Sequence, residues 1–94
     1  MHGFIFKPKH SGFYATPLHA LLQHLGTRTV IITGVTIEQC VLFTAIDAFM
    51  REFELMVPSD CVAGLTQTKY VLNHLRTVLK AKTSPSPRLR LAAR

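Results

Sequence analysis

The stretch TVIITGVTIEQCVLFTAIDAF, residues 29–49, decides the fold class of this chain. Residues 29–33 are all β-branched and do not alternate with polar residues at the centre, which is typical of a parallel strand covered on both faces. Gly34 ends this strand, and Thr36 with Gln39 three residues later matches a capping box. A helix is therefore expected over residues 37–53, directly after the strand.

Similar strand–helix units flank this stretch. Upstream, residues 2–7 (HGFIFK) predict a short strand, Thr16-Pro17 predicts a helix start, and Gly26 predicts its end. Downstream, residues 54–57 predict a third strand and residues 70–79 a third helix. Such units predict an α/β fold, a three-layer α/β/α parallel sheet of Rossmann-like type. With about three units the sheet is either a small domain or the C-terminal portion of an incomplete, larger one.

Length and charge indicate one domain followed by a basic tail. The chain has 94 residues and a formal charge of +6, and Lys80, Lys82, Arg88, Arg90 and Arg94 all lie after residue 79 with no acid among them. We therefore assign residues 1–79 to the domain and expect residues 80–94 to be a disordered, solvated tail. A basic excess confined to a tail predicts no specific nucleic-acid site.

Other patterns exclude further classes of protein. There is no apolar run long enough for a membrane span and no leader-peptide pattern, so a cytoplasmic location is expected. Cys40 and Cys61 are expected to be free thiols, with Cys61 packed in a loop. The histidine spacing predicts no metal site, and no cofactor is expected.

Three loops follow the expected strands, and ligands of open α/β sheets bind at the carboxyl ends of the strands. These loops are residues 7–14, 34–40 and 58–63. Cys40 lies in the first turn of its helix, where free amides and the helix dipole favour a thiolate, and the Lys7 ammonium nearby would favour it further. A second interpretation stays open, in which Cys40 is a small buried side chain and Lys7 a solvated strand end.

Three segments together resemble the isochorismatase-like cysteine hydrolase family, which includes nicotinamidases and N-carbamoylsarcosine amidohydrolases. They are KPKHSGFYATPL (residues 7–18), TGVTIEQCVLFTAIDA (residues 33–48) and VPSDCVAG (residues 57–64). The likeness extends over about residues 3–79. It implies a hydrolase that cleaves a C–N bond of a small amide, ureide or carbamoyl compound.

The resemblance also implies roles for individual residues. Cys40 would be the nucleophile that forms a covalent intermediate, and Lys7 would be the lysine of an Asp–Lys–Cys triad. A cis peptide bond would join Val35 and Thr36, and the amides of Thr36 and Cys40 would form an oxyanion hole.

Three further residues are candidates for a substrate pocket, namely His10, Phe13 and Tyr14. For the two aromatic residues a position in the core is an equally open alternative. For His10 the alternative is a solvated loop position.

One part of the family pattern is not matched. The triad aspartate belongs to a D-x-Q-type segment before the lysine, and neither Asp47 nor Asp60 corresponds to it. In the family, that segment's strand lies between the lysine-bearing and the cysteine-bearing strands. We therefore expect negligible activity from the chain alone, and expect a homo-oligomer or pairing with a missing N-terminal portion. The alternative function is a catalytically inactive, truncated module that associates with another chain.

Overall fold

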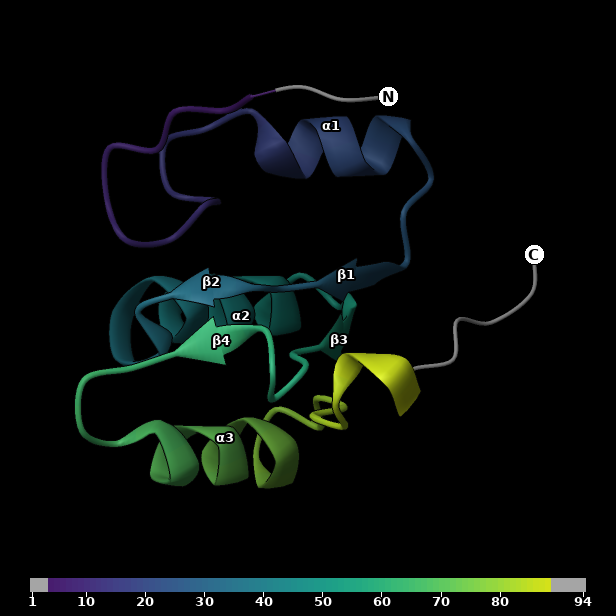
Figure 1. Cartoon of the computed structure of the whole chain (residues 1–94). Helices are drawn as coiled ribbons and strands as arrows, with labels where there is room; N and C mark the ends of the chain where they lie inside the picture. The colour runs from purple at the N-terminus through teal and green to yellow at the C-terminus, as the bar shows by residue number, and fades with distance from the viewer. Residues whose placement is uncertain (1–3, 89–94) are drawn as a thin grey trace.

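The computed structural model describes residues 4–88, which form helices around short parallel strands (Figure 1). The strands are β1 (Thr29–Ile31), β2 (Gly34–Val35), β3 (Glu54–Met56) and β4 (Val62–Ala63). The helices are α1 (Leu18–His24), α2 (Leu42–Met50) and α3 (Thr68–Thr77), with a π-helical segment η1 (Ile37–Val41) before α2 and a 3-10 turn η2 (Ser86–Arg88). In Figure 1 α1 and α3 lie on opposite sides of the strands.

The strands form two parallel pairs. β1 pairs with β3, with Val30 opposite Leu55, and β2 pairs with β4, with Val35 opposite Ala63. The expected strand over residues 29–33 is thus β1, and the chain then continues into β2, where the amide of Gly34 donates to the carbonyl of Cys61 (2.9 Å). The parallel α/β class is confirmed, and β4 is an addition to the sequence prediction.

The strand expected over residues 2–7 does not form in the described part, residues 4–7. Phe4 and Phe6 are 95% and 93% exposed, and β1 is hydrogen-bonded to β3 alone. An extended segment becomes a stable strand only beside a partner, and within residues 4–88 none lies next to this one. His2 and Gly3 fall outside the described residues.

The core lies between the strands and the helices that follow them. Ile37, Val41, Ala45 and Ala48 share one side of η1 and α2 and are almost fully buried, and Leu75 of α3 packs into the same core cluster. These positions recur at the helical spacing that the sequence predicts.

The helix predicted over residues 37–53 is observed as η1 and α2, and both of its ends differ from the prediction. The Thr36 side chain makes no capping bond, because the turn is π-helical and the Thr36 carbonyl accepts the amides of Gln39 (3.0 Å) and Val41 (3.2 Å). The expected capping box is therefore wrong. At the other end Glu52 adopts a left-handed conformation (φ 67°), and the amide of Phe53 bonds back to the carbonyl of Ala48 (3.1 Å).

The C-terminal end of α1 follows the sequence closely, whereas its start is shifted by one residue, with Pro17 rather than Thr16 at the N-cap position. Thr16 Oγ1 accepts the amide of Leu18 (3.3 Å), and Gly26 (φ 70°) closes the helix while the amide of Thr27 bonds to the carbonyl of Leu22 (3.0 Å). This bond pattern is a Schellman motif. α1 nevertheless has no buried residue, and its Leu25 is 46% exposed.

The expected disordered tail is wrong for residues 80–88. Lys82 lies opposite Met56 on the free edge of β3: its amide donates to Leu55 (2.9 Å) and its carbonyl accepts the amide of Val57 (2.8 Å). Ala81 is buried, and Ser86 bonds to Asp60. These contacts are mostly backbone hydrogen bonds, which a polar, basic sequence does not reveal. Residues 89–94 lie outside the described part.

Candidate active site

Lys7, His10 and Cys40 converge near the end of η1, just before α2 begins. The Nζ of Lys7 lies 3.5 Å from the Sγ of Cys40 and also donates to the carbonyl of Lys9 (3.3 Å). The Nδ1 of His10 lies 3.9 Å from the same sulfur, and its ring packs on Phe43 (5.7 Å between centroids). Cys40 is partly buried, whereas Lys7 and His10 are exposed. A lysine beside a partly buried cysteine is an arrangement typical of nucleophilic cysteines.

Lys7 and Cys40 meet although, within residues 4–88, no strand lies between the segments that carry them. Residues 7–13, the lysine loop, lie along α2 instead. Within it, the amide of Gly12 donates to Thr44 Oγ1 (3.0 Å) and the hydroxyl of Ser11 donates to Asp47 Oδ2. Side chains of the T-A-x-D-A segment thus hold the loop that carries Lys7.

Phe13 anchors the far end of the lysine loop. It is 4% exposed, with its ring centroid 6.1 Å from that of Phe53, and the Arg51 guanidinium lies 4.9 Å above it. Phe13 is therefore a core residue, the alternative left open by the sequence. Tyr14 is 56% exposed.

The peptide bond between Val35 and Thr36 is cis, as the resemblance implies. It lies between β2 and η1, at the carboxyl end of the strand that leads to Cys40. The assignment of the Thr36 and Cys40 amides to an oxyanion hole stays a prediction.

Glu38, two residues before Cys40, was not singled out by the sequence. Its carboxylate accepts the amides of Leu65, Thr66 and Gln67 (each 2.9 Å), which precede α3. These bonds, that of Gln67 first, lower the pKa of Glu38 to about 2. A Cβ on Gly64 would lie 2.5 Å from Glu38 Oε1, so a glycine is required where the carboxylate docks. The pairing joins η1 to α3 and fixes the segment that carries Cys40.

Comparison with known proteins places this arrangement in a family. Residues 2–83 match the model of the Isochorismatase domain. The chain belongs to the isochorismatase family. It is 47% identical over 81 residues to the isochorismatase family protein YaaI of Bacillus subtilis. The aligned residues make up 84% of this chain and 45% of that protein.

Two solved structures of amide-cleaving enzymes share the fold. The nicotinamidase SaPncA of Staphylococcus aureus superposes with a TM-score of 0.84 at 35% identity, over 86% of this chain and 51% of that one. The N-carbamoylsarcosine amidase of Thermoplasma acidophilum gives 0.83 at 30% identity, over 93% and 50%. This isochorismatase-family chain thus spans about half the length of these relatives.

No carboxylate contacts the Lys7–Cys40 pair within residues 4–88. All five acidic residues of the chain lie in this range. Four of them have other partners: Glu38 the amides before α3, Asp47 Ser11 and Arg51, Glu54 Thr29, and Asp60 Ser86. The fifth, Glu52, lies beyond the end of α2. Hydrogen bonds from the Ser86 hydroxyl and amide lower the pKa of Asp60. The same part of the chain brings together no three potential metal ligands, and none of its helices has the length and apolar character needed to cross a membrane.

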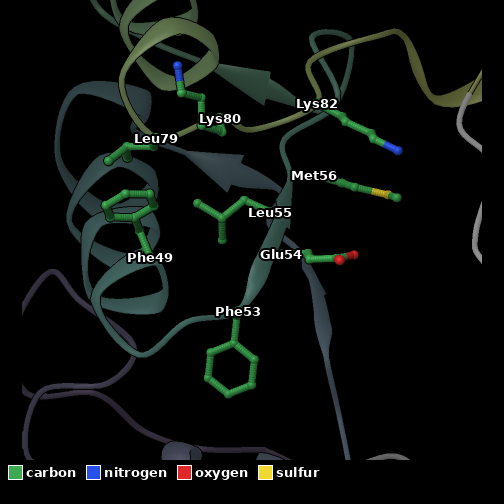
Figure 2. A pocket seen from close by; sticks show the side chains of 8 residues that line it. All are labelled: Phe49, Phe53, Glu54, Leu55, Met56, Leu79, Lys80 and Lys82. Carbon is green, nitrogen blue, oxygen red and sulfur yellow. The ribbon is translucent and has the colours of Figure 1, made fainter.

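A shallow pocket of about 360 Å³ lies elsewhere on the domain (Figure 2). Its lining comes from the end of α2, from β3 and from the segment after α3: Phe49, Phe53, Glu54, Leu55, Met56, Leu79, Lys80 and Lys82. None of the residues at the Cys40 site lines it.

Proposed function

We propose that this chain carries the nucleophile of a hydrolase that cleaves a C–N bond of a small amide, ureide or carbamoyl compound, in a cytoplasmic reaction. The observation that carries the proposal is the 3.5 Å separation between Lys7 Nζ and Cys40 Sγ at the carboxyl end of β2. The nicotinamidase and N-carbamoylsarcosine amidase among the relatives support amides and carbamoyl compounds as the substrate class.

The proposed reaction has two stages. The Cys40 thiolate attacks the carbonyl carbon, a Cys40–carbon bond forms, and the C–N bond breaks as the leaving nitrogen takes up a proton. Water then attacks the acyl carbon, the Cys40–carbon bond breaks, and the acid and the thiolate are released. Lys7 holds the thiolate, and the amides of Thr36 and Cys40 are proposed to stabilise the oxyanion.

Proton transfer is assigned to an aspartate that this chain does not place at the site. Within residues 4–88 no acid contacts Lys7 or Cys40, although the leaving nitrogen must gain a proton and the attacking water must lose one. We therefore propose that turnover requires an aspartate supplied by another polypeptide segment, and that the chain alone has negligible amidase activity.

An activity assay with a supplied aspartate tests this function. The chain is mixed with the N-terminal half of the S. aureus nicotinamidase, and ammonia release from nicotinamide and a panel of small amides and ureides is measured. Cys40→Ser is expected to abolish any release, while Cys61→Ser retains most of it. Full turnover by Cys40→Ser would overturn the proposal.

The second candidate function is a non-catalytic module that pairs with another chain. Within residues 4–88, β1 has a strand partner on one side only, and the apolar residues of α1 are at most partly buried. Such edges and surfaces favour association. We propose that the partner is a segment equivalent to the other half of the relatives' chains, placed beside β1. Sedimentation together with thermal unfolding tests this association. A stable monomer with a sharp thermal transition would contradict it. A homodimer would contradict the proposed partner, because a second copy of this chain would then lie beside β1.

A further inference from the structure

We infer that Ser11 and Asp47 are positioning residues, which hold Lys7 beside Cys40 by anchoring the lysine loop to α2. The inference rests on the proposed role of the Lys7–Cys40 pair. It assigns a function to an aspartate that does not correspond to the family's triad aspartate.

The anchors lie on the same face of the helix as the nucleophile. Cys40, Thr44 and Asp47 follow one another at intervals of four and three residues, which places them on one side of η1 and α2, and Arg51, four residues after Asp47, caps the helix on the same side. The lysine loop follows this side: Lys7 contacts Cys40, Gly12 contacts Thr44, and Ser11 contacts Asp47.

Ser11 is the centre of the anchor. It is 6% exposed, and its hydroxyl donates to Asp47 Oδ2. Ser11 Oγ in turn accepts the amide of Phe13 (3.1 Å). The other carboxylate oxygen of Asp47 pairs with Arg51 Nη1 (3.1 Å), which fixes the orientation of the carboxylate. Loss of the Ser11 hydroxyl would leave the buried Phe13 amide without this acceptor, so the loop would release rather than keep an unsatisfied group.

Release of the anchor would act on Lys7. Within residues 4–88 the Lys7 ammonium bonds only to Cys40 and to Lys9 of its own loop, and residues 4–7 belong to no strand. The contacts of Ser11 and Gly12 with α2 are thus the nearest hydrogen bonds between the lysine-bearing segment and the helix, beside the packing of the His10 ring on Phe43. The position of the ammonium depends on them.

The test is the alkylation of Cys40 by iodoacetamide in the full chain carrying Cys61→Ser. The ratio of the rate at about pH 7 to the rate at about pH 9.5 measures the thiolate fraction. Lys7→Met is expected to lower this ratio about sevenfold. Ser11→Ala is expected to lower it about threefold, as if the Lys7 ammonium moved to twice its distance from the Cys40 sulfur. Ser11→Thr, which retains the hydroxyl, is expected to restore the ratio. Ser86→Ala is the matched control, because it removes another serine–aspartate contact, at Asp60, and leaves the ratio unchanged.

Combining Ser11→Ala with Lys7→Met separates the possible failures. In the Lys7→Met background Ser11→Ala is expected to have no further effect. If Lys7→Met leaves the ratio unchanged, the proposed Lys7–Cys40 pair itself is wrong. If Lys7→Met lowers the ratio but Ser11→Ala does not, or if Ser11→Ala has the same effect in both backgrounds, the positioning role is overturned. Should Ser11→Ala unfold, Asp47→Asn replaces it, with faster amide exchange at Gly12 and Phe13 expected and unchanged exchange contradicting the anchor.

Discussion

The Lys7 ammonium is expected to raise the thiolate fraction of Cys40 by an amount set by their separation. At 3.5 Å two unit charges attract by about 1.2 kcal/mol in bulk water and by about 4.7 kcal/mol at an effective dielectric constant of about 20. Lys7 is exposed, so the lower figure applies, and it corresponds to about a sevenfold change in thiolate fraction. Lys7→Met removes the charge and keeps a side chain of similar shape.

The assay compares alkylation at two pH values because a stabilised thiolate is also a weaker nucleophile. That opposing effect reduces the loss in rate at about pH 7 to about threefold, whereas the ratio of the two rates retains the full sevenfold change. The measurement uses Cys61→Ser protein, so that Cys40 is the one thiol. An unchanged ratio in Lys7→Met, with the fold intact by circular dichroism, would refute the electrostatic role of Lys7.

Three further perturbations test the fold. Leu75→Ala empties a fully buried site and is expected to cost about 2–5 kcal/mol, lowering Tm by at least about 10 °C in thermal unfolding, whereas Leu65→Ala at an exposed position changes little. Glu52→Gly relieves a left-handed residue and is expected to stabilise by about 1 kcal/mol in urea unfolding; a loss of stability would contradict the helix end described. The folded pKa of Glu38, about 2, lies below its ordinary 4.5, so the stabilising effect of this carboxylate is present above about pH 4.5 and lost toward about pH 2. Glu38→Gln is expected to remove the change in unfolding free energy over that pH window. An unchanged acid dependence would contradict the pairing of Glu38 with the amides before α3.

The elements that the sequence predicts well are those whose residues alone determine them. β1 and β3 each end in two apolar residues, the buried side of α2 follows the helical period, and Gly26 has the positive φ that ends α1. The roles of Lys7 and Cys40 are predicted from the family resemblance, whereas spacing alone leaves them open. The structure places the two side chains 3.5 Å apart, and their roles stay predictions.

The features that the sequence misses depend on partners far along the chain. Residues 4–7 have strand-like composition but no neighbouring strand, and β4 is too short to show a period. Lys82 pairs with β3 through its backbone, which its charged side chain does not indicate. The anchor of the lysine loop had a signal in the sequence, the helical spacing of Thr44 and Asp47 from Cys40, but its partners Gly12 and Ser11 lie over 30 residues away.

The most direct test of the central claim is to trap the acyl intermediate on Cys40. An activated ester such as p-nitrophenyl acetate needs no proton on its leaving group, so the chain alone is expected to form the thioester. Peptide mapping by mass spectrometry after brief exposure is expected to find the acetyl group on Cys40, with little on Cys61 and a slower reaction in Lys7→Met. Acetylation of both cysteines at the same rate, or of Cys40 at the same rate without Lys7, would contradict the account.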